Sequence, residues 1–357
     1  KTLPEEQRDY FFSGPDPVTW IHIPGTVHQF ELPKDAQTIT VGSARDCTIR
    51  VPSEYMSKHH CTLERMFDGI RVLDHSKNGT GKDARKVAVP TDLRAGQTFS
   101  AGGGITFLAL NDEMRRVYPL LCDLLGWQTE TSLVPPTRRD PSADHIIQLA
   151  AGVDHLLING DEGCDQEQLA RAIHSISPLR ARELVLVRSI PDDRAQQKEL
   201  LVRATRTTMV LVLDDQTPVI DEAFRSAMFS TSYRIRLLVI GSPRQALAVL
   251  GDEHWFRQIN LRPLAYRGDQ LETLLDRLLE ERGSSLRFAE LSAANRKALL
   301  GYGWSKNFDE LRLAADRLGA IQRTGSLRKA AAALGDDRWK VQYWFSTQVG
   351  LKLPLKG

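Results

Sequence analysis

The chain lacks any run of about 18 apolar residues, so the sequence predicts no membrane-spanning helix. Its first residues also lack the apolar core of a secretory signal. Cysteine is scarce, because only Cys47, Cys61, Cys122 and Cys164 are present and no two have the spacing of a metal clip. These absences predict reduced thiols, no disulfide framework and a cytoplasmic location.

An excess of charge of either sign is also missing, since 47 Lys and Arg stand against 45 Asp and Glu. A nucleic-acid binder is therefore not indicated by composition alone. Locally the balance fails: residues 323–357 hold seven basic and two acidic side chains, so the C-terminal tail is basic. The length of 357 residues, 41% of them hydrophobic, suffices for two or three domains with separate cores.

Residues 17–110 contain many short runs rich in β-branched and apolar residues, separated by Gly, Pro, Asn and Asp. Many short strands with regular turn signals predict a β-sandwich or a barrel. Residues 112–126 then change to helical spacing, which predicts a trailing helix. The expected strands are 18–23, 38–41, 61–65, 70–73 and 105–110.

A proline-rich stretch within residues 131–142 predicts a linker. Beyond it, nearly continuous apolar runs alternate with helical stretches, which is typical of a parallel sheet buried on both faces. The expected strands are 155–158, 184–187, 209–213 and 235–240, and the expected helices are 166–175, 195–203 and 218–228. Further helices are expected at 269–282, 292–301, 307–322, 326–334 and 337–348.

Three loops of the predicted sandwich combine hydroxyls, cations and an amide, a mixture that suits a phosphate dianion. We call them the first loop (41–47), the second loop (57–60) and the third loop (74–80). Gly42, Ser57 to His60, and Asn78-Gly79-Thr80 follow one another in the order found in forkhead-associated (FHA) domains. Residues 17–110 thus resemble that family, and the resemblance implies recognition of phosphothreonine peptides.

The resemblance also implies individual roles. Ser57 would bind the phosphate and Asn78 the peptide backbone, while His60 would tie the loops together. Because the family's phosphate-binding Arg is replaced by Ser43, we expect Arg45 or Lys58 to supply the charge. The expected phosphopeptide-binding residues are Ser43, Arg45, Ser57, Lys58 and Asn78, and the expected structural residues are Gly42, His60 and Gly79.

Two alternatives remain open for this region. The sandwich would serve docking alone if no phosphate were read. His59 and His60 would be metal ligands in the second alternative, but no cluster of Cys or carboxylates accompanies them in the sequence, so no metal site is expected.

The stretch 156–174 has the strand, Gly-containing turn and helix of a phosphate-binding P-loop. Gln166 occupies the position of the P-loop Lys, and Asp165 replaces the Gly before it. With Asp161 and Glu162 the turn carries three carboxylates and no cation. This charge opposes the binding of a triphosphate.

More broadly, residues 143–322 resemble the AAA+ domain of bacterial enhancer-binding proteins, ATPases that activate the nitrogen-type alternative sigma factor. Residues 158–174 match the Walker A region, residues 210–215 match Walker B, and residues 304–311 match the lid motif. Arg257 stands at the arginine-finger position. The degenerate nucleotide site would comprise Gly160, Gly163, Gln166, Asp214, Asp215 and Arg257.

Four departures from the family weaken the same activity. The Walker Lys is Gln166, the sensor Arg is Asp309, and the sensor Asn is Ser242. No Gly-Ala-Phe-Thr-Gly-Ala loop, the sigma-contacting element, lies between the Walker regions. We therefore expect a scaffold that is not an enzyme, with no catalytic residue and no ATP or other cofactor. Nucleotide binding without turnover, and active hydrolysis, remain as alternatives.

Near the C-terminus, a helix rich in small residues ends at Gly335, and Asp336-Asp337 is expected to cap the next helix. The pattern Ala330, Ala331, Leu334, Gly335, Gly350 and Leu351 resembles a Fis-type helix-turn-helix. The resemblance implies DNA contacts by Arg338, Lys340 and Gln342. The alternative is a helical bundle that closes the lid, with Trp339, Tyr343, Trp344 and Phe345 as core or as a protein-docking face.

The expected architecture is multidomain: an all-β FHA sandwich with a trailing helix (1–130), a linker (131–142), an α/β AAA+-like P-loop NTPase domain (143–265), an α-helical lid (266–322) and a helix-turn-helix (323–357). The leading hypothesis is a phosphothreonine-reading, DNA-binding transcription regulator with a non-catalytic AAA+-like scaffold. Its expected partners are a phosphothreonine-containing protein from a Ser/Thr kinase and duplex DNA, and not a membrane; a homo-oligomer is left open. The alternatives are a phosphopeptide-dependent adaptor without DNA binding and an ATP-dependent sigma activator.

Overall fold

The computed structural model describes residues 16–77, 79–82, 85–86, 90–102, 104–132, 142–251 and 256–356. The chain divides into two compact units, Lys1–Asn159 with Glu167–Ile259, and Gly160–Gln166 with Asn260–Gly357. Within the described ranges, none of the helices combines the length and apolar character that crossing a bilayer requires. The linker predicted at 131–142 lies almost entirely outside the described residues.

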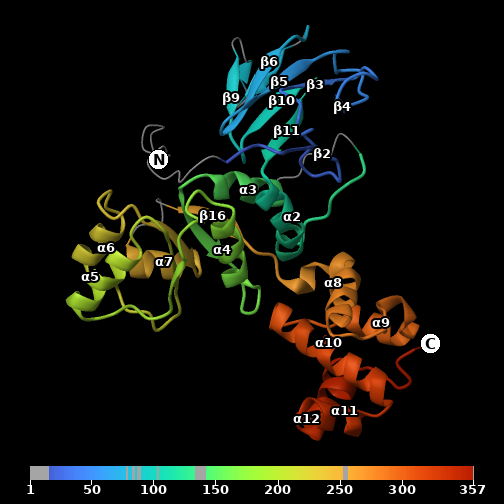
Figure 1. Cartoon of the computed structure of the whole chain (residues 1–357). Coiled ribbons are helices and arrows are strands. Elements are labelled where there is room, and N and C mark those ends of the chain that lie inside the picture. Colours follow the sequence, from blue (N-terminus) through green and yellow to red (C-terminus); the bar gives the residue numbers. More distant parts are fainter. Residues whose placement is uncertain are drawn as a thin grey trace. The chain divides into compact units, whose positions relative to one another are not determined.

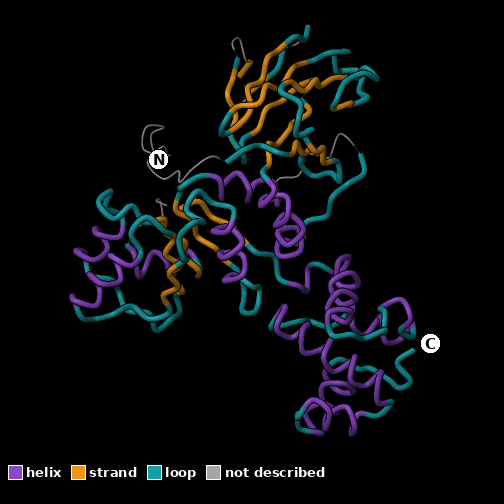
Figure 2. Tube along the Cα trace, in the orientation of Figure 1, coloured by secondary structure: helices purple, strands orange, loops and turns teal. Residues whose placement is uncertain are grey.

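The N-terminal part is a β-sandwich, as the sequence predicts (Figures 1 and 2). One sheet has the strand order β2 (Gln29–Glu31), β1 (Trp20–His22), β11 (Ile105–Leu110), β10 (Thr98–Ala101), β7 (Gly81–Lys82) and β8 (Arg85–Lys86). The other has the order β4 (Ile49–Arg50), β3 (Thr38–Gly42), β5 (Cys61–Met66), β6 (Gly69–Asp74) and β9 (Thr91–Leu93). All five expected strands are confirmed.

Alternating burial explains how these short strands form a core. In β3, Ile39 and Val41 are fully buried while Thr40 between them is half-buried. Across the other sheet, Phe99 of β10 stacks on its register partner Phe107 of β11 with ring centroids 4.9 Å apart. The trailing helix is also confirmed as α2 (Asp112–Leu125), whose N-terminus is capped by the side chain of Asn111.

The middle of the chain forms the expected parallel sheet. Its strand order is β13 (Val185–Val187), β14 (Thr208–Val212), β15 (Arg236–Ile240), β12 (His155–Asn159) and β16 (Phe256–Asn260). Strands β12, β14 and β15 are buried on both faces, in line with their continuous apolar sequences. The accompanying helices are α4 (Gln166–Ser175), α5 (Arg194–Arg203), α6 (Glu222–Met228) and α7 (Pro243–Leu250).

Three elements of this part are absent from the sequence-based expectations: α7, β16 and α3 (Ala143–Ala151). Helix α3 depends on a buried arginine that is distant in the sequence. The guanidinium of Arg236 donates to the carbonyl of Ala150 at 3.0 Å and to that of Leu149 at 2.8 Å. These bonds satisfy carbonyls at the C-terminal end of α3 that have no partner within the helix.

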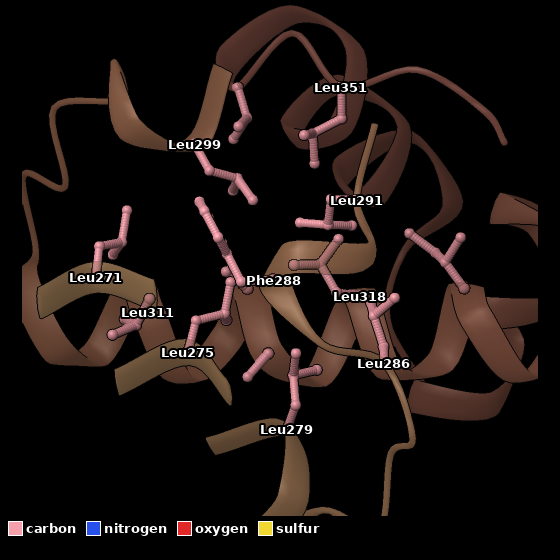
Figure 3. Packing of buried hydrophobic residues seen from close by; sticks show 14 of the residues in the cluster. Leu271, Leu275, Leu279, Leu286, Phe288, Leu291, Leu299, Leu311, Leu318 and Leu351 are labelled. Carbon is pink, nitrogen blue, oxygen red and sulfur yellow. The ribbon is translucent and has the colours of Figure 1, made fainter. Parts of the chain in front are cut away.

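The second unit is helical. Its elements are η2 (Leu264–Tyr266), α8 (Gly268–Glu281), η3 (Phe288–Glu290), α9 (Ala293–Leu300), α10 (Asn307–Thr324), α11 (Leu327–Leu334), α12 (Arg338–Tyr343) and the π-helical turn η4 (Trp344–Gln348). The five helices expected after residue 269 are confirmed, the last of them divided into α12 and η4. Leu275 of α8, Leu311 of α10 and Leu351 near the C-terminus belong to a single hydrophobic core (Figure 3).

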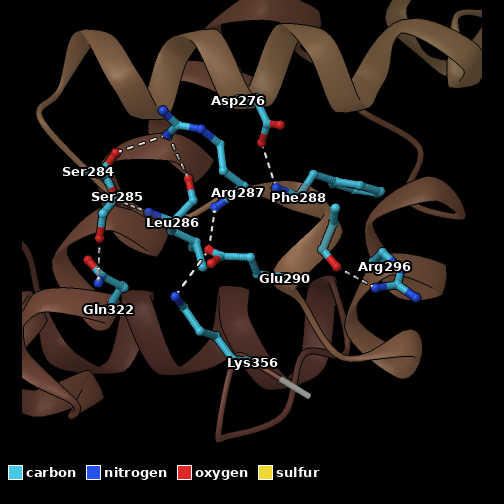
Figure 4. A network of polar contacts seen from close by, with 11 residues as sticks. Asp276, Ser284, Ser285, Leu286, Arg287, Phe288, Glu290, Arg296, Gln322 and Lys356 are labelled. Atoms are coloured by element: carbon cyan, nitrogen blue, oxygen red, sulfur yellow. Dashed lines mark hydrogen bonds and ion pairs between the residues drawn. The ribbon is translucent and has the colours of Figure 1, made fainter.

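Polar contacts fix the C-terminal segment to the same core. The buried side chain of Asn295 donates to the carbonyls of Lys352 and Leu355 at 2.9 and 3.1 Å and accepts from the Lys352 amide at 2.8 Å. The Lys356 ammonium lies 3.1 Å from Glu290, which also accepts a hydrogen bond from the Arg287 amide (Figure 4). The core is therefore continuous across the predicted boundary between residues 322 and 323.

Candidate functional site

Main-chain hydrogen bonds hold the first and second loops of the sandwich together. The amide of Ser43 donates to the carbonyl of Ser57 at 3.0 Å, and that of Ala44 donates to the carbonyl of Lys58 at 3.1 Å. A Cβ atom at Gly42 would stand only 2.0 Å from the Lys58 carbonyl oxygen, so this approach requires glycine. The backbone of the two loops is thus fixed by the sheet from which they emerge.

His60 connects the second loop to its neighbours on both sides. Its side chain is fully buried, and its Nδ1 accepts a hydrogen bond from the Ser57 amide at 3.2 Å. Its own amide donates to Val41, and its carbonyl accepts from His75 of the third loop at 2.9 Å. Burial lowers the pKa of His60, which favours the neutral imidazole that this accepting role needs.

The third loop is organised by its own polar side chains. Asp74 accepts hydrogen bonds from the Ser76 amide at 3.1 Å and from the Thr80 hydroxyl at 2.8 Å. The Ser76 hydroxyl in turn accepts from the Gly79 amide at 2.7 Å. Asn78, the residue expected to bind the peptide backbone, lies outside the described residues.

The first two loops offer two cations and a hydroxyl. Arg45 and Lys58 are exposed, and within the described ranges neither side chain has an ion-pair partner. Ser57, which directly precedes Lys58, is half-buried. Ser43, at the family's Arg position, donates its hydroxyl hydrogen to the Met56 carbonyl at 3.0 Å. The charge for a phosphate would therefore come from Arg45 and Lys58.

Sequence reasoning missed a cluster at this edge of the sandwich. Asp46 and Cys47 of the first loop and His59 of the second each present one ligand-type atom, and these atoms lie within 4.8 Å of one another. The Asp46 carboxylate is 3.0 Å from Nε2 of His59, and this contact lowers the pKa of Asp46. No cluster of Cys or carboxylates accompanies His59 along the sequence, but the fold brings Asp46 and Cys47 close to its side chain.

The turn 160–166, where the sequence predicts a degenerate P-loop, is closed by the side chain of one of its own residues. Nε2 of Gln166 donates to the carbonyl of Gly160 at 2.8 Å and to that of Asp161 at 2.9 Å. Gly163 adopts φ 76°, and a Cβ atom there would stand 2.1 Å from the Lys306 carbonyl oxygen. Asp161 and Glu162 are exposed, whereas Asp165 is half-buried.

Helix α10 and the residues before it contact this turn directly. Asn307 donates from its side-chain amide to the Glu162 carbonyl at 2.8 Å, and the Phe308 amide donates to the Gly163 carbonyl at 2.9 Å. Arg312 forms an ion pair with Asp165, with Nη1 at 3.0 Å from one carboxylate oxygen. The turn itself holds no cation, but two come from outside it: Arg312 pairs with Asp165, and the Lys306 ammonium lies 3.7 Å from the Glu162 carboxylate.

Asp214 and Asp215, the residues expected at the Walker B position, both accept hydrogen bonds. Asp214 accepts hydrogen bonds from the Thr217 hydroxyl at 2.8 Å and the Gln216 amide at 2.9 Å, and these bonds lower its pKa. Asp215 accepts from the side chain of Gln245 at 2.9 Å.

The residues expected at the sensor and arginine-finger positions lie at the start of α7 and on β16. Ser242 caps α7 in a reciprocal capping box with Gln245. Arg257, expected at the arginine-finger position, is exposed on β16.

The aromatic residues of α12 and η4 fall into a buried group and an exposed group. Trp344 and Phe345 are buried in the core, while Trp339 and Tyr343 are 72% and 56% exposed. The expected helix cap is confirmed for Asp337, whose carboxylate accepts from the Trp339 and Lys340 amides.

The exposed face of α12 carries the residues that the sequence assigns to DNA. Arg338, Lys340 and Gln342 are all exposed, and the Arg338 guanidinium lies 5.6 Å from the centroid of the Trp339 ring. Asp336, the other expected cap, instead forms an ion pair with Arg317 at 2.8 Å.

Comparison with known proteins identifies the sandwich. Residues 39–102 match the family model of the FHA domain, so the chain contains an FHA domain. No curated protein matches the sequence of the chain.

Several solved structures are similar to parts of the chain. NtrX from Brucella abortus in complex with ATP matches with 14% identity over 58% of this chain and 66% of its own, at a TM-score of 0.39, so the chain spans slightly less than two thirds of that protein. The FHA domain of CT664 from Chlamydia trachomatis has 24% identity over 26% of this chain and 95% of its own, at a TM-score of 0.24. EmbR from Mycobacterium tuberculosis, in complex with a low-affinity phosphopeptide, has 19% identity over 26% of this chain and 24% of its own, at a TM-score of 0.23.

Proposed function

We propose that the chain reads phosphothreonine on a partner protein and binds duplex DNA through its last helices, as a transcription regulator whose α/β domain is a scaffold without ATP turnover. One observation carries the proposal. An FHA domain presents Ser57, Arg45 and Lys58 on two loops that the sheet holds together through paired main-chain hydrogen bonds. Loops of fixed backbone with free donors lose little entropy on binding a ligand.

The chemistry of the loops supports recognition of a phosphate. A phosphothreonine carries close to two negative charges and three strong acceptor oxygens at neutral pH. The Ser57 hydroxyl can donate to one oxygen, and the exposed cations Arg45 and Lys58 can pair with the others. Ser43 is already bonded to Met56, so it contributes position and not charge.

A phosphothreonine-peptide library tests this proposal with the full chain as bait. We expect selective retention of phosphorylated peptides and loss of binding to the same peptides without phosphate. Ser57→Ala removes a hydrogen bond to a charged group, so we expect roughly ten- to a hundredfold weaker binding, equivalent to about 1.5–3 kcal/mol. Ser175→Ala on α4 is the matched control, because its hydroxyl bonds within the helix to Ala172.

Equal affinity of Ser57→Ala and the unmodified chain for the selected peptide would contradict the assignment of Ser57. Absence of any phosphate-dependent binding in the library would contradict phosphothreonine reading altogether and would favour a sandwich kept for docking.

The proposal of a scaffold without turnover rests on the turn 160–166. In a P-loop the main-chain amides and a lysine face the phosphates. Here the Gln166 side chain bonds two carbonyls of its own turn, and Arg312 pairs with Asp165, so the polar groups are engaged with one another. Phosphoryl transfer needs cations arranged around the phosphates, and this turn offers carboxylates.

A second candidate function is a phosphopeptide-dependent adaptor that does not bind DNA. The exposure of Trp339 and Tyr343 on α12 favours it, since exposed aromatic side chains are enriched at protein interfaces. The salt-dependent DNA measurement described in the Discussion separates the two candidates.

A further inference from the structure

We propose that Asp46, Cys47 and His59 form a Zn²⁺ site that bridges the first and second loops of the FHA domain. The three side chains offer an oxygen, a sulfur and a nitrogen, and the ligand atoms all lie within 4.8 Å of one another. Tetrahedral Zn²⁺ with bonds of about 2.0–2.3 Å holds its ligand atoms roughly 3.3–3.8 Å apart. Small rotations of the two exposed side chains therefore suffice to bring the set to coordination distance.

The position of the cluster gives a metal ion access from solvent. The side chains of His59 and Asp46 are 54% and 73% exposed, whereas Cys47 lies beneath them and is 7% exposed. Three protein ligands leave the fourth position of a tetrahedral ion for water. The donor set of thiolate, imidazole and carboxylate suits Zn²⁺, while an all-oxygen set would be expected for Mg²⁺ or Ca²⁺.

The backbone around the cluster is compatible with losing the thiol proton. Cys47 now donates through its Sγ to the Lys58 carbonyl at 3.2 Å, and binding of Zn²⁺ to the thiolate would release that proton to solvent. The Lys58 carbonyl would still accept from the Ala44 amide at 3.1 Å, so it would not be left unpaired. The ion would replace the direct contact between Asp46 and His59, which is 3.0 Å long.

A bridging ion would stabilise both loops and would take none of its ligands from the residues assigned to the phosphate. Because Zn²⁺ would bind the folded loops and not the unfolded chain, added zinc should raise the melting temperature of the full chain. The site does not depend on the proposed function, since it uses neither Ser57 nor Asn78.

The test measures zinc binding to the metal-free full chain by competition with a chromophoric chelator, with Co²⁺ as a spectroscopic substitute. We expect one equivalent of Zn²⁺ to bind and Co²⁺ to show a thiolate charge-transfer band. Losing a direct ligand should cost more than the roughly ten- to hundredfold effect of outer partners. We therefore expect at least a hundredfold weaker binding for Cys47→Ser and for His59→Ala, with the cobalt band lost in Cys47→Ser.

Cys122→Ser is the matched control, because Cys122 is a half-buried cysteine on α2 outside the cluster. If Cys47→Ser fails to fold, His59→Ala decides alone, since the side chain of His59 is exposed. The proposal is overturned if zinc binds the unmodified chain and both variants equally, if the cobalt complex lacks a thiolate band, or if the unmodified chain binds no zinc.

Discussion

Asp165 and Arg312 form the ion pair that matters most for the turn 160–166. The Asp165 side chain is only 13% exposed and has a left-handed backbone with φ 60°, which non-glycine residues rarely adopt. Its carboxylate is paired with Arg312, which also contacts the exposed Asp309 at 3.1 Å. A carboxylate at the expected phosphate-binding turn would repel a phosphate. The Asp165 carboxylate forms an ion pair within the protein.

We predict that Arg312→Ala lowers the free energy of unfolding by about 1–3 kcal/mol, because it leaves the half-buried Asp165 carboxylate without its charged partner. Urea denaturation of the full chain measures the change. The matched control is Asp309→Ala, which removes the exposed partner of Arg312 and should cost less than about 1 kcal/mol. Equal effects of the two variants would contradict the importance of the pair with Asp165.

The sequence reveals part of this arrangement. The departures at Gln166 and Asp165 are visible because a phosphate-binding turn has an expected residue at each position. The partner Arg312 is not visible, because it lies 147 residues away and no local pattern links it to the turn. The cluster of Asp46, Cys47 and His59 escapes for the same reason, since two loops bring it together.

Among the elements, α12 carries the DNA-binding proposal. We predict that the double variant Arg338→Ala/Lys340→Ala weakens duplex binding and lowers the magnitude of the slope of log K against log salt by about 2, because each phosphate contact releases roughly one counterion. Fluorescence anisotropy at several salt concentrations measures both quantities.

The matched control for α12 is Arg194→Ala/Lys198→Ala, which removes two exposed cations from α5. An unchanged slope in the α12 variant, or an equal change in the α5 variant, would contradict a DNA role for α12. No salt-sensitive duplex binding by the unmodified chain would favour the adaptor function, with Trp339 and Tyr343 as docking residues.

Strand β12 gives the α/β domain a predicted dependence on pH. His155 packs against Phe229 and Phe256, and its Nδ1 accepts from the Leu237 amide at 3.0 Å. Burial, aided by the nearby Arg236, lowers the pKa of His155 to about 4. The unfolded chain, with a histidine pKa of about 6.5, then binds a proton that the folded chain does not.

The stabilising contribution of His155 is therefore complete above about pH 6.5 and is lost as the pH falls towards 4, at about 1.4 kcal/mol per pKa unit. We predict that His155→Asn, which keeps an acceptor near the Leu237 amide, reduces the fall in unfolding free energy between pH 7 and pH 5. The reduction should equal about one to two pKa units at about 1.4 kcal/mol each. A residual slope should remain, because burial also lowers the pKa of His174. If unfolding free energy falls in parallel with pH for His155→Asn and for the unmodified chain, this pH dependence does not come from His155.

At the scale of elements, the sequence predicts those with a strong period or a continuous apolar run. Strands β12, β14 and β15 and helices α4, α8 and α10 are of this kind. Helix α3 was missed because its C-terminal end depends on Arg236, and α7 was missed although Ser242 and Gln245 form a capping box. A seryl cap with Gln three positions later is a local signal that the sequence does contain.

For the whole molecule, we propose that recognition at several surfaces takes the place of chemistry at one centre. The FHA domain is the part that the comparisons identify, and DNA binding and the absence of turnover are proposals that rest on charge and contacts. The C-terminal helices share their hydrophobic core with the helices predicted as a lid, so the segment proposed to bind DNA and the turn 160–166 belong to one unit. Sequence patterns predict the sandwich, the α/β domain and the C-terminal helices, but they do not show that the C-terminal helices share a core with the predicted lid.

The measurement that tests the account most directly is isothermal titration calorimetry of the full chain with ATP and Mg²⁺. We predict no saturable heat up to millimolar nucleotide, because the side chains of Gln166 and Asp165 are engaged within the protein and the Lys306 ammonium pairs with Glu162 of the turn. Stoichiometric binding, with turnover abolished by Asp214→Ala, would contradict the account and identify the chain as a working ATPase.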